Sequence, residues 1–160
     1  MKKRNGFTLV EIVIVIALLG LMMLLVVPNV VNRFANAKRN MFYNDVLNLY
    51  SNAASEYISR AADDPSTPNY FCKGDSACGE LSSNPMGVDA ADDLQYYIEV
   101  DTSGHIIVIY VVNNDFLYSD HVSETLLTIE KKDIDKNKIA PRPTGGAAAI
   151  YVPVDDDQLN

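Results

Sequence analysis

Residues 7–27 read FTLVEIVIVIALLGLMMLLVV, a run of 21 residues in which Glu11 is the only charged side chain. As an α-helix this run would be roughly 31 Å long at 1.5 Å per residue, which is enough to cross the hydrocarbon core of a bilayer. A charged side chain inside a membrane helix is costly and usually faces a partner. The run therefore predicts a helix buried in lipid or among like helices, and the position of Glu11 needs an explanation.

A short basic segment with Lys2, Lys3 and Arg4 precedes the apolar run. Secretory signal peptides begin in the same way, but their apolar region spans about 7–15 residues and is followed by a small-residue cleavage site. Here the run is longer and continues into PNVVNRFANAKRN (28–40) without such a site. A membrane anchor or an unusual processed leader fits better. Basic residues flank the run on both sides, so their count gives almost no indication of which end of the helix lies on the cytoplasmic side of the membrane.

Glu11 lies one helical turn after Phe7, and the run itself contains no Lys, Arg or His. In one interpretation the carboxylate snorkels to the membrane interface and has no further role. In the other it has a cationic partner. A cut in the chain before Phe7 would supply one, because the cut creates a new α-amino group.

The segment MKKRNGFTLVEIVIVIALLG (1–20) resembles the N-terminus of type IV prepilins and of type II secretion pseudopilins. The resemblance rests on a short basic leader that ends at Gly6, on Phe7 to Glu11, and on the long apolar run. Pro28 falls where many of these proteins have a helix-kinking proline. The resemblance covers about the first thirty residues.

This resemblance implies that a prepilin peptidase cuts the chain between Gly6 and Phe7 and so removes residues 1–6. The same enzyme would methylate the new amine of Phe7. Glu11 would then pair with the Phe7 amine of a neighbouring identical subunit in a helical homopolymer. The implied partners are the prepilin peptidase/methylase, an inner-membrane assembly platform and the membrane itself. The precursor would cross the cytoplasmic membrane once with its N-terminus inside, and the assembled subunit would lie in an extracellular pilus.

Beyond Pro28 the apolar residues recur at helical spacing, which predicts one helix from about residue 7 to residue 61 with a kink at Pro28. Residues 7–28 are apolar on all sides, whereas residues 29–61 are amphipathic and should pack on a sheet. Core positions are expected from Phe34 through Met41 and Val46 to Tyr57.

Residues 62–93 are rich in Ser, Asn, Asp, Gly and Pro, which predicts a long connecting loop and a candidate surface for subunit contacts. Strand signals follow at 94–100 and 105–113, separated by the turn DTSG, and indicate an antiparallel hairpin. A further strand or short helix is expected near 126–130, an edge strand at 147–154, and a frayed acidic tail at 155–160. The predicted fold is α+β: a long kinked helix on a three- to four-stranded antiparallel sheet within 94–154, as in pilins.

Cys72 and Cys78 are the two cysteines of the chain, and neither histidine is close to them in sequence. Zinc sites usually need four ligands, so a local disulfide is favoured over a metal site, with two unpaired thiols as the alternative. A structural disulfide would place this part of the chain in an oxidising compartment, outside the cytoplasm.

The formal net charge of −8 disfavours binding to nucleic acid, because an acidic body repels phosphates. DIDKNK (133–138) begins like a calcium loop, but Lys138 stands where that loop needs glycine and Thr144 where it needs the bidentate glutamate. Asp155–Asp157 could contribute to an ion site in three dimensions. No nucleophile motif or phosphate loop is present, so neither an enzyme nor a cofactor is expected.

Three functions compete. The first is a main pilin of a type IV pilus, or fimbrium, which the length of residues 62–93 and the predicted disulfide favour. The second is a pseudopilin of a type II secretion or DNA-uptake system. The third is a membrane-anchored binding domain that does not polymerise and keeps its N-terminus uncut. A further alternative is an adhesive tip subunit of low abundance whose loop binds a receptor. Such subunits sometimes lack the glutamate, so the presence of Glu11 favours a role in the shaft.

Overall fold

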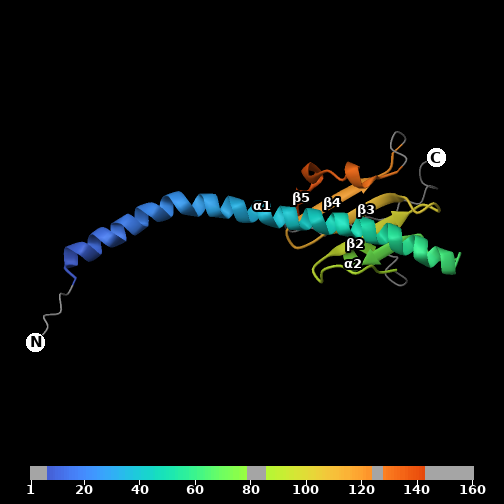
Figure 1. Cartoon of the computed structure of the whole chain (residues 1–160), viewed down its shortest axis with the longest axis horizontal. Coiled ribbons are helices and arrows are strands. Elements are labelled where there is room, and N and C mark those ends of the chain that lie inside the picture. Colours follow the sequence, from blue (N-terminus) through green and yellow to red (C-terminus); the bar gives the residue numbers. More distant parts are fainter. Residues whose placement is uncertain (1–6, 79–85, 124–127, 143–160) are drawn as a thin grey trace, which may run out of the picture. The chain divides into compact units, whose positions relative to one another are not determined.

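A computed structural model describes residues 7–78, 86–123 and 128–142, apart from the side chains of residues 25–29, 75 and 76. It confirms the α+β fold, with a long N-terminal helix followed by an antiparallel sheet (Figure 1). In chain order the elements are α1 (Leu9–Asp63), β1 (Tyr70–Lys73), α2 (Asp75–Cys78), β2 (Gln95–Val100), β3 (Ile106–Val112), β4 (Phe116–His121), the 3-10 turns η2 (Lys131–Asp133) and η3 (Lys136–Lys138), and β5 (Ala140–Pro141).

Helix α1 contains 55 residues and continues through Pro28 without interruption. It ends at Asp63, two residues beyond the predicted end and just before Pro65. The kink at Pro28 stays a prediction. The chain divides into two compact units, residues 1–38 and residues 39–160, and α1 contributes to both.

Within the second unit α1 packs on the sheet through one face. Its buried side chains recur every three or four residues, as expected for a helix stripe: Phe42, Val46, Leu49, Ala53 and Tyr57. The predicted stripe began too early, because Phe34 and Met41 are about two-thirds exposed, at 68% and 67%. Helical periodicity gives the direction of an apolar face but not the residue at which a partner surface begins.

The sheet is a meander with strand order β1-β2-β3-β4-β5, and all neighbours are antiparallel. The predicted hairpin is present as β2 and β3, in which Tyr97 lies opposite Tyr110. Its turn ends at Gly104, whose φ of +87° favours glycine, and the Asp101 carboxylate accepts hydrogen bonds from the backbone N–H groups of Ser103 and His105.

Three strands of the sheet, β1, β4 and β5, were missed. The expected loop 62–93 contains β1, whose four residues are too short for a clear alternating pattern. Strand β4 lies at residues 116–121. Of the strand or short helix expected near 126–130, the described residues 128–130 form neither, and residues 126–127 lie outside the described residues. The predicted strand 147–154 and the tail 155–160 also lie outside them.

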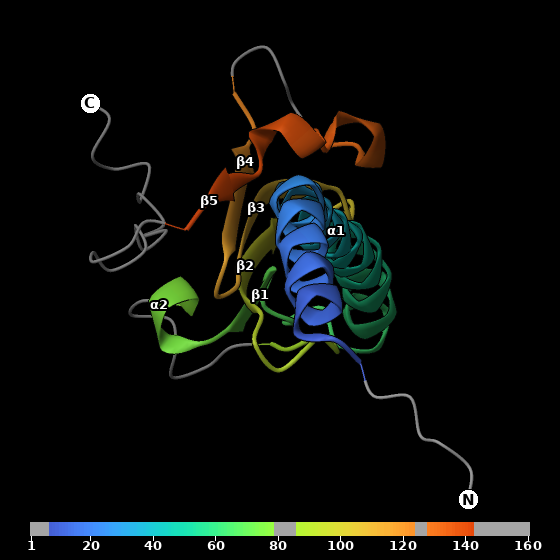
Figure 2. The ribbon, with the colours of Figure 1, turned by 90° about the vertical axis from the view of Figure 1, so that its left-hand side faces the viewer.

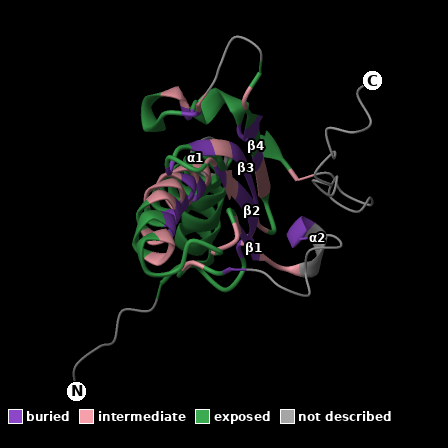
Figure 3. Cartoon of the chain, turned by 90° about the vertical axis from the view of Figure 1, so that its right-hand side faces the viewer, coloured by how far each residue is buried: buried purple, intermediate pink, exposed green. Residues whose placement is uncertain are grey.

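Most residues of the central strands are buried (Figure 3), and their side chains belong to two separate apolar clusters. One face packs against α1, and α2 lies on the opposite side of the sheet (Figures 2 and 3). The α1-facing core includes Phe71, Tyr96, Ile98, Ile109, Val111 and Tyr118. Tyr96, Tyr97 and Tyr110 are all 2% exposed or less.

The segment Ile129–Arg142, here called the strap, is fastened to α1 by side chains of the helix. The guanidinium of Arg39 donates to the carbonyl oxygens of Lys136 and Ile139, both at 3.0 Å. The hydroxyl of Tyr50 donates to the carbonyl of Ile129 at 2.8 Å. These bonds hold irregular backbone against the helix where no sheet ladder is available.

Both edges of the sheet are short or covered. On the outer side of β1, the backbone N–H of Cys72 donates to the carbonyl of Met86 at 2.7 Å, and Phe71 forms an isolated bridge with Met86. At the other edge β5 has two residues, one of which is Pro141. Little unpaired strand backbone therefore faces outwards among the described residues.

Candidate functional site: the N-terminal segment

Glu11 closes the first turn of α1. Its Oε2 accepts hydrogen bonds from the backbone N–H of Thr8 at 2.8 Å and from the Thr8 hydroxyl at 2.9 Å. The Glu11 backbone N–H donates in return to Thr8 Oγ1 at 3.3 Å. Thr8 immediately precedes the helix, so this is a capping box of the T-x-x-E type. The T-x-x-E spacing is visible in the sequence, but the capping role of Thr8 was not predicted.

The helix behind this cap presents its apolar side chains to the outside. Every described side chain from Leu9 to Leu24 is exposed, and the larger ones lie between 49% and 80%. Phe7 is 84% exposed. A contiguous apolar surface of this extent is far larger than a soluble monomer normally carries, so it indicates contact with lipid or with other helices. Among the described residues, however, no helix meets the combined length and hydropathy expected of a membrane span.

The sequence from Phe7 to Leu24 has no basic side chain. Among the described residues, Glu11 therefore has no cationic partner. Both Thr8 donors use the same carboxylate oxygen. The geometry therefore presents an exposed carboxylate, oriented by its own helix cap, one turn after Phe7.

Comparison with known protein families decides the nature of this segment. The family model described as the prokaryotic N-terminal methylation motif matches residues 1–27. The matched motif is that of the class III signal peptide found in type IV pilins and pseudopilins. The methylation motif confirms the resemblance found in the sequence, and it supports a pilin or pseudopilin precursor that is a structural subunit rather than an enzyme. The motif also fits a membrane-anchored precursor.

Neither curated proteins nor solved structures give a match to this chain. The methylation motif covers the N-terminal segment alone, so the assignment of the remaining residues rests on the fold.

The predicted site residues differ in how much the structure describes of them. Phe7 and Glu11 are exposed at the start of α1, within one turn of each other. Gly6 lies outside the described residues, and the side chain of Pro28 is not described. Cleavage, methylation and the assembly role of Glu11 stay predictions.

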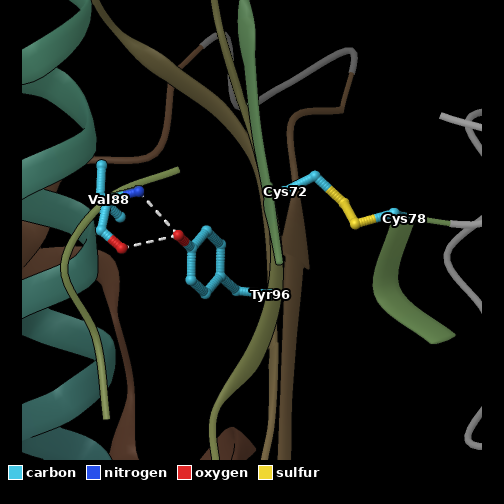
Figure 4. Close-up of a disulfide and its surroundings, with 4 residues drawn as sticks. All are labelled: Cys72, Cys78, Val88 and Tyr96. Atoms are coloured by element: carbon cyan, nitrogen blue, oxygen red, sulfur yellow. Dashed lines mark hydrogen bonds between the residues drawn. A yellow bond between two sulfur atoms is a disulfide. The ribbon is translucent and has the colours of Figure 1, made fainter. Parts of the chain in front are cut away.

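Cys72 and Cys78 form a disulfide, with their Cα atoms 5.5 Å apart. The bond links β1 to the C-terminal end of α2, and both cysteines are 2% exposed. Figure 4 shows the disulfide on one side of the sheet and Tyr96 on the other. There the Tyr96 hydroxyl donates to the carbonyl of Val88 at 2.8 Å and accepts from the N–H of the same residue at 2.7 Å.

The calcium-like stretch 133–138 is part of the strap, and its carboxylates cap short turns. Asp133 accepts from the backbone N–H of Glu130, and Asp135 accepts from that of Asn137. The Lys138 ammonium lies 2.5 Å from Asp120 Oδ2. Among the described residues no three Asp, Glu, His or Cys side chains converge as a metal site would require. Asp155–Asp157 lie outside the described residues.

Proposed function

We propose that this protein is the main structural subunit of a type IV pilus. The observation that supports this most directly is the match of residues 1–27 to the methylation motif, within which the apolar side chains of α1 are exposed. In the proposed pathway the chain is cut between Gly6 and Phe7, the new Phe7 amine is methylated, and subunits polymerise through the N-terminal half of α1.

In the proposed filament Glu11 accepts the Phe7 amine of a neighbouring subunit. An ion pair within an apolar helix bundle specifies register, since apolar packing alone tolerates sliding. The capping box supports this role, because Thr8 holds the carboxylate at the first turn while one carboxylate oxygen carries both Thr8 bonds. The proposed partners are identical subunits, the prepilin peptidase/methylase and an inner-membrane assembly platform.

The main alternative is a pseudopilin of a type II secretion or DNA-uptake system, which would share the same N-terminal chemistry. The disulfide suits an oxidising compartment outside the cytoplasm, which is compatible with both a surface pilin and a pseudopilin. A membrane-anchored domain that does not polymerise is the second alternative, and it requires an uncut chain.

The deciding experiment is mass spectrometry of the N-terminal peptide in material sheared from native cells. A methylated Phe7 in abundant sheared material is the expected result. A methylated Phe7 that is confined to the cell envelope would favour the pseudopilin. Intact Met1 in the membrane fraction would overturn both and leave the anchored domain.

A further inference from the structure

The part of α1 that packs on the sheet has two flanks of different character. Its buried stripe consists of Phe42, Val46, Leu49, Ala53 and Tyr57. Residues one position before members of this stripe line two polar pockets, whereas the residues directly after Phe42 and Leu49 bind the strap. Successive residues of a helix are turned by about 100°, so these two sets lie on opposite sides of the stripe. They are called here the groove flank and the strap flank.

The strap flank is covered by a basic segment. The hydroxyls of Tyr43 and Tyr50 donate to the carbonyls of Ile134 and Ile129, at 3.2 and 2.8 Å. Of the ten Lys and Arg residues that follow residue 6, five belong to the strap, which has three acidic residues. The strap therefore has a net charge of +2 in a chain whose net charge is −8.

Two lysines of the strap keep their charge unneutralised. The ammonium of Lys131 donates to the hydroxyl of Ser51 at 2.8 Å, and that of Lys136 donates to the side-chain oxygen of Asn40. Both acceptors are neutral groups of α1. Lys131 and Lys136 are exposed, and neither forms an ion pair with a described carboxylate. Their positive charges are therefore available to a partner.

The groove flank borders a polar groove between α1 and residues 86–94. The groove consists of two pockets of about 330 and 190 Å³, which share Asn52 and Asp89. Helix α1 also contributes Asp45, Asn48 and Glu56, and the facing wall is formed by residues 87–91 and Leu94. The groove therefore offers carboxylates and amides to whatever enters it.

Most of the charge at the groove is negative. Residues 86–94 include three aspartates and no basic residue. Glu56 is paired with Arg60 at 2.8 Å, but Asp45, Asp89 and Asp93 form no ion pair within the described part of the chain. Burial raises the pKa of Asp45, and the negative charge of Asp93 raises it further. A cation from outside would relieve this repulsion.

The strap and the groove lie at opposite edges of the sheet (Figure 2). Residues 86–94 begin beside β1, where Met86 bonds to Cys72, and the strap includes β5 at the other edge. A contact between opposite flanks of two copies is head-to-tail, so it can repeat along a filament. The groove flank also begins six residues after Arg39, the first strap ligand on α1, which is about 9 Å along the helix. Parallel copies joined in this way would be displaced along α1, as in a helical array.

We propose that the strap of one subunit docks on the groove flank of the next subunit. Lys131 and Lys136 of the strap face the carboxylates of the groove, namely those of Asp45, Asp89 and Asp93. This inference rests on the proposed function, because it assigns the contact between the folded units of neighbouring subunits in the filament. Charge complementarity and the head-to-tail placement of the two surfaces favour a second copy of this chain as the occupant.

Charge exchange tests this contact in cells that produce the full chain. Lys131→Glu with Lys136→Glu should lower the yield of sheared filaments by about tenfold, because like charges then face each other. Asp89→Lys with Asp93→Lys should have the same effect. The four substitutions together should restore the yield to within about twofold of the unaltered chain. Ser119→Lys adds a charge on the sheet face turned away from α1, and as the control it should leave the yield unchanged.

Cross-linking of the unaltered chain keeps the proposal testable if a variant fails to fold. Full chains labelled with light and heavy nitrogen are mixed in detergent and treated with a carbodiimide, which joins a carboxylate to an amine in contact with it. The expected product links residues 86–94 of a light chain to the strap of a heavy chain, or the reverse. Its yield should fall at least about fivefold in about 1 M salt, which screens exposed charges.

Failure of this inference and failure of the proposed function give different results. Sheared filaments with a methylated Phe7 whose yield resists both charge reversals would overturn the docking and leave the pilin. Links between heavy and light copies of a chain that keeps Met1 would support the docking and overturn the pilin.

Two further results would overturn the docking. The first is a fourfold variant that is folded by circular dichroism but gives no more filaments than either double variant. The second is carbodiimide links that join the groove only to its own copy or to a different protein.

Discussion

Both hydrogen bonds that Glu11 accepts from Thr8 end on Oε2, so its cap and its proposed intersubunit pair can coexist on one carboxylate. The two roles differ in what they require. A capping box accepts Gln in place of Glu, whereas an ion pair needs the charge. Substitutions at this one position can therefore separate helix capping from assembly.

Glu11→Gln should keep the cap and lower the yield of sheared filaments by at least about tenfold, because a buried amine loses its counter-charge. Glu11→Ala should lower it at least as much. Thr8→Val is the matched control: it removes the hydroxyl from the cap but leaves the charge, and most filaments should remain. Immunoblots of sheared and cellular fractions measure the yield. A normal yield for Glu11→Gln would leave capping as the only role of Glu11.

Asp45 shows how a single carboxylate can weaken the fold. Burial raises its pKa, and the nearby negative charge of Asp93 raises it further. Asp45 also lines a polar pocket of about 190 Å³ together with Asp89. Because its pKa is higher in the folded state than in the unfolded state, the folded state binds the proton more tightly. Stability should therefore fall as pH rises from below the ordinary value of 3.8 through the raised pKa.

Asp45→Asn should raise the thermal midpoint at pH 7 and leave it unchanged at a pH well below 3.8, where both side chains are neutral. Scanning calorimetry at the two pH values measures this. Asp93→Asn should reproduce part of the gain at pH 7, because it removes the like charge. A loss of stability at pH 7 in Asp45→Asn would contradict the expectation.

At the scale of elements, the turn between β2 and β3 depends on Gly104. Its φ is +87°, and a Cβ there would lie 2.8 Å from Cγ1 of Ile58 on α1. Gly104→Ala should lower the free energy of unfolding by about 1–3 kcal/mol through backbone strain and the clash with Ile58. Denaturant unfolding measures the change.

Gly87→Ala is the control for this turn, because its Cβ would come no closer than 3.9 Å to another atom and its φ is not positive. It should change the free energy of unfolding by no more than about 0.5 kcal/mol. Equal effects at the two glycines would show that the φ and the contact with Ile58 do not matter.

The same elements show what the sequence could predict. The apolar run, the hairpin of β2 and β3 and the Asp101–Gly104 turn have strong local signals, and the structure has them as expected. Strand β4 was missed because FLYSDH alternates weakly and ends in polar residues. Strand β1 gains its place from pairing with β2, which is a contact between distant residues that local periodicity cannot report.

The N-terminal segment was predicted from the types and spacing of its residues, not from a strand or helix pattern. Phe7 and Glu11 were identified because their types and spacing are unusual in an apolar run. The cap by Thr8 was equally local and could have been predicted from the T-x-x-E spacing. The strap could not, because the Arg39 and Tyr50 bonds join residues that lie 79 to 100 positions apart.

At the scale of the whole molecule, the hydrophobic core and the methylation motif belong to different units of the chain. Every helix residue of the main core lies at or beyond Phe42, within the unit of residues 39–160. The methylation motif lies entirely within residues 1–38. The second unit should therefore fold without the first.

A chain that begins at Asn32 should be soluble without detergent and should unfold cooperatively, with its free energy of unfolding within about 1 kcal/mol of the full chain in detergent. Circular dichroism during a urea titration measures this. An Asn32 chain that also carries Gly104→Ala serves as the control for sensitivity. Loss of cooperative unfolding in the parent Asn32 chain would show that residues 1–31 contribute to the core.

The two closed sheet edges limit how copies of this molecule can join. With Met86 bonded beside β1 and Pro141 in a two-residue β5, a neighbouring copy finds few open backbone groups along the described sheet edges to which it could add a strand. Growth by an amyloid-like route is thereby disfavoured even where many copies are crowded together. Contacts between crowded subunits along these described edges should therefore form mainly through side chains.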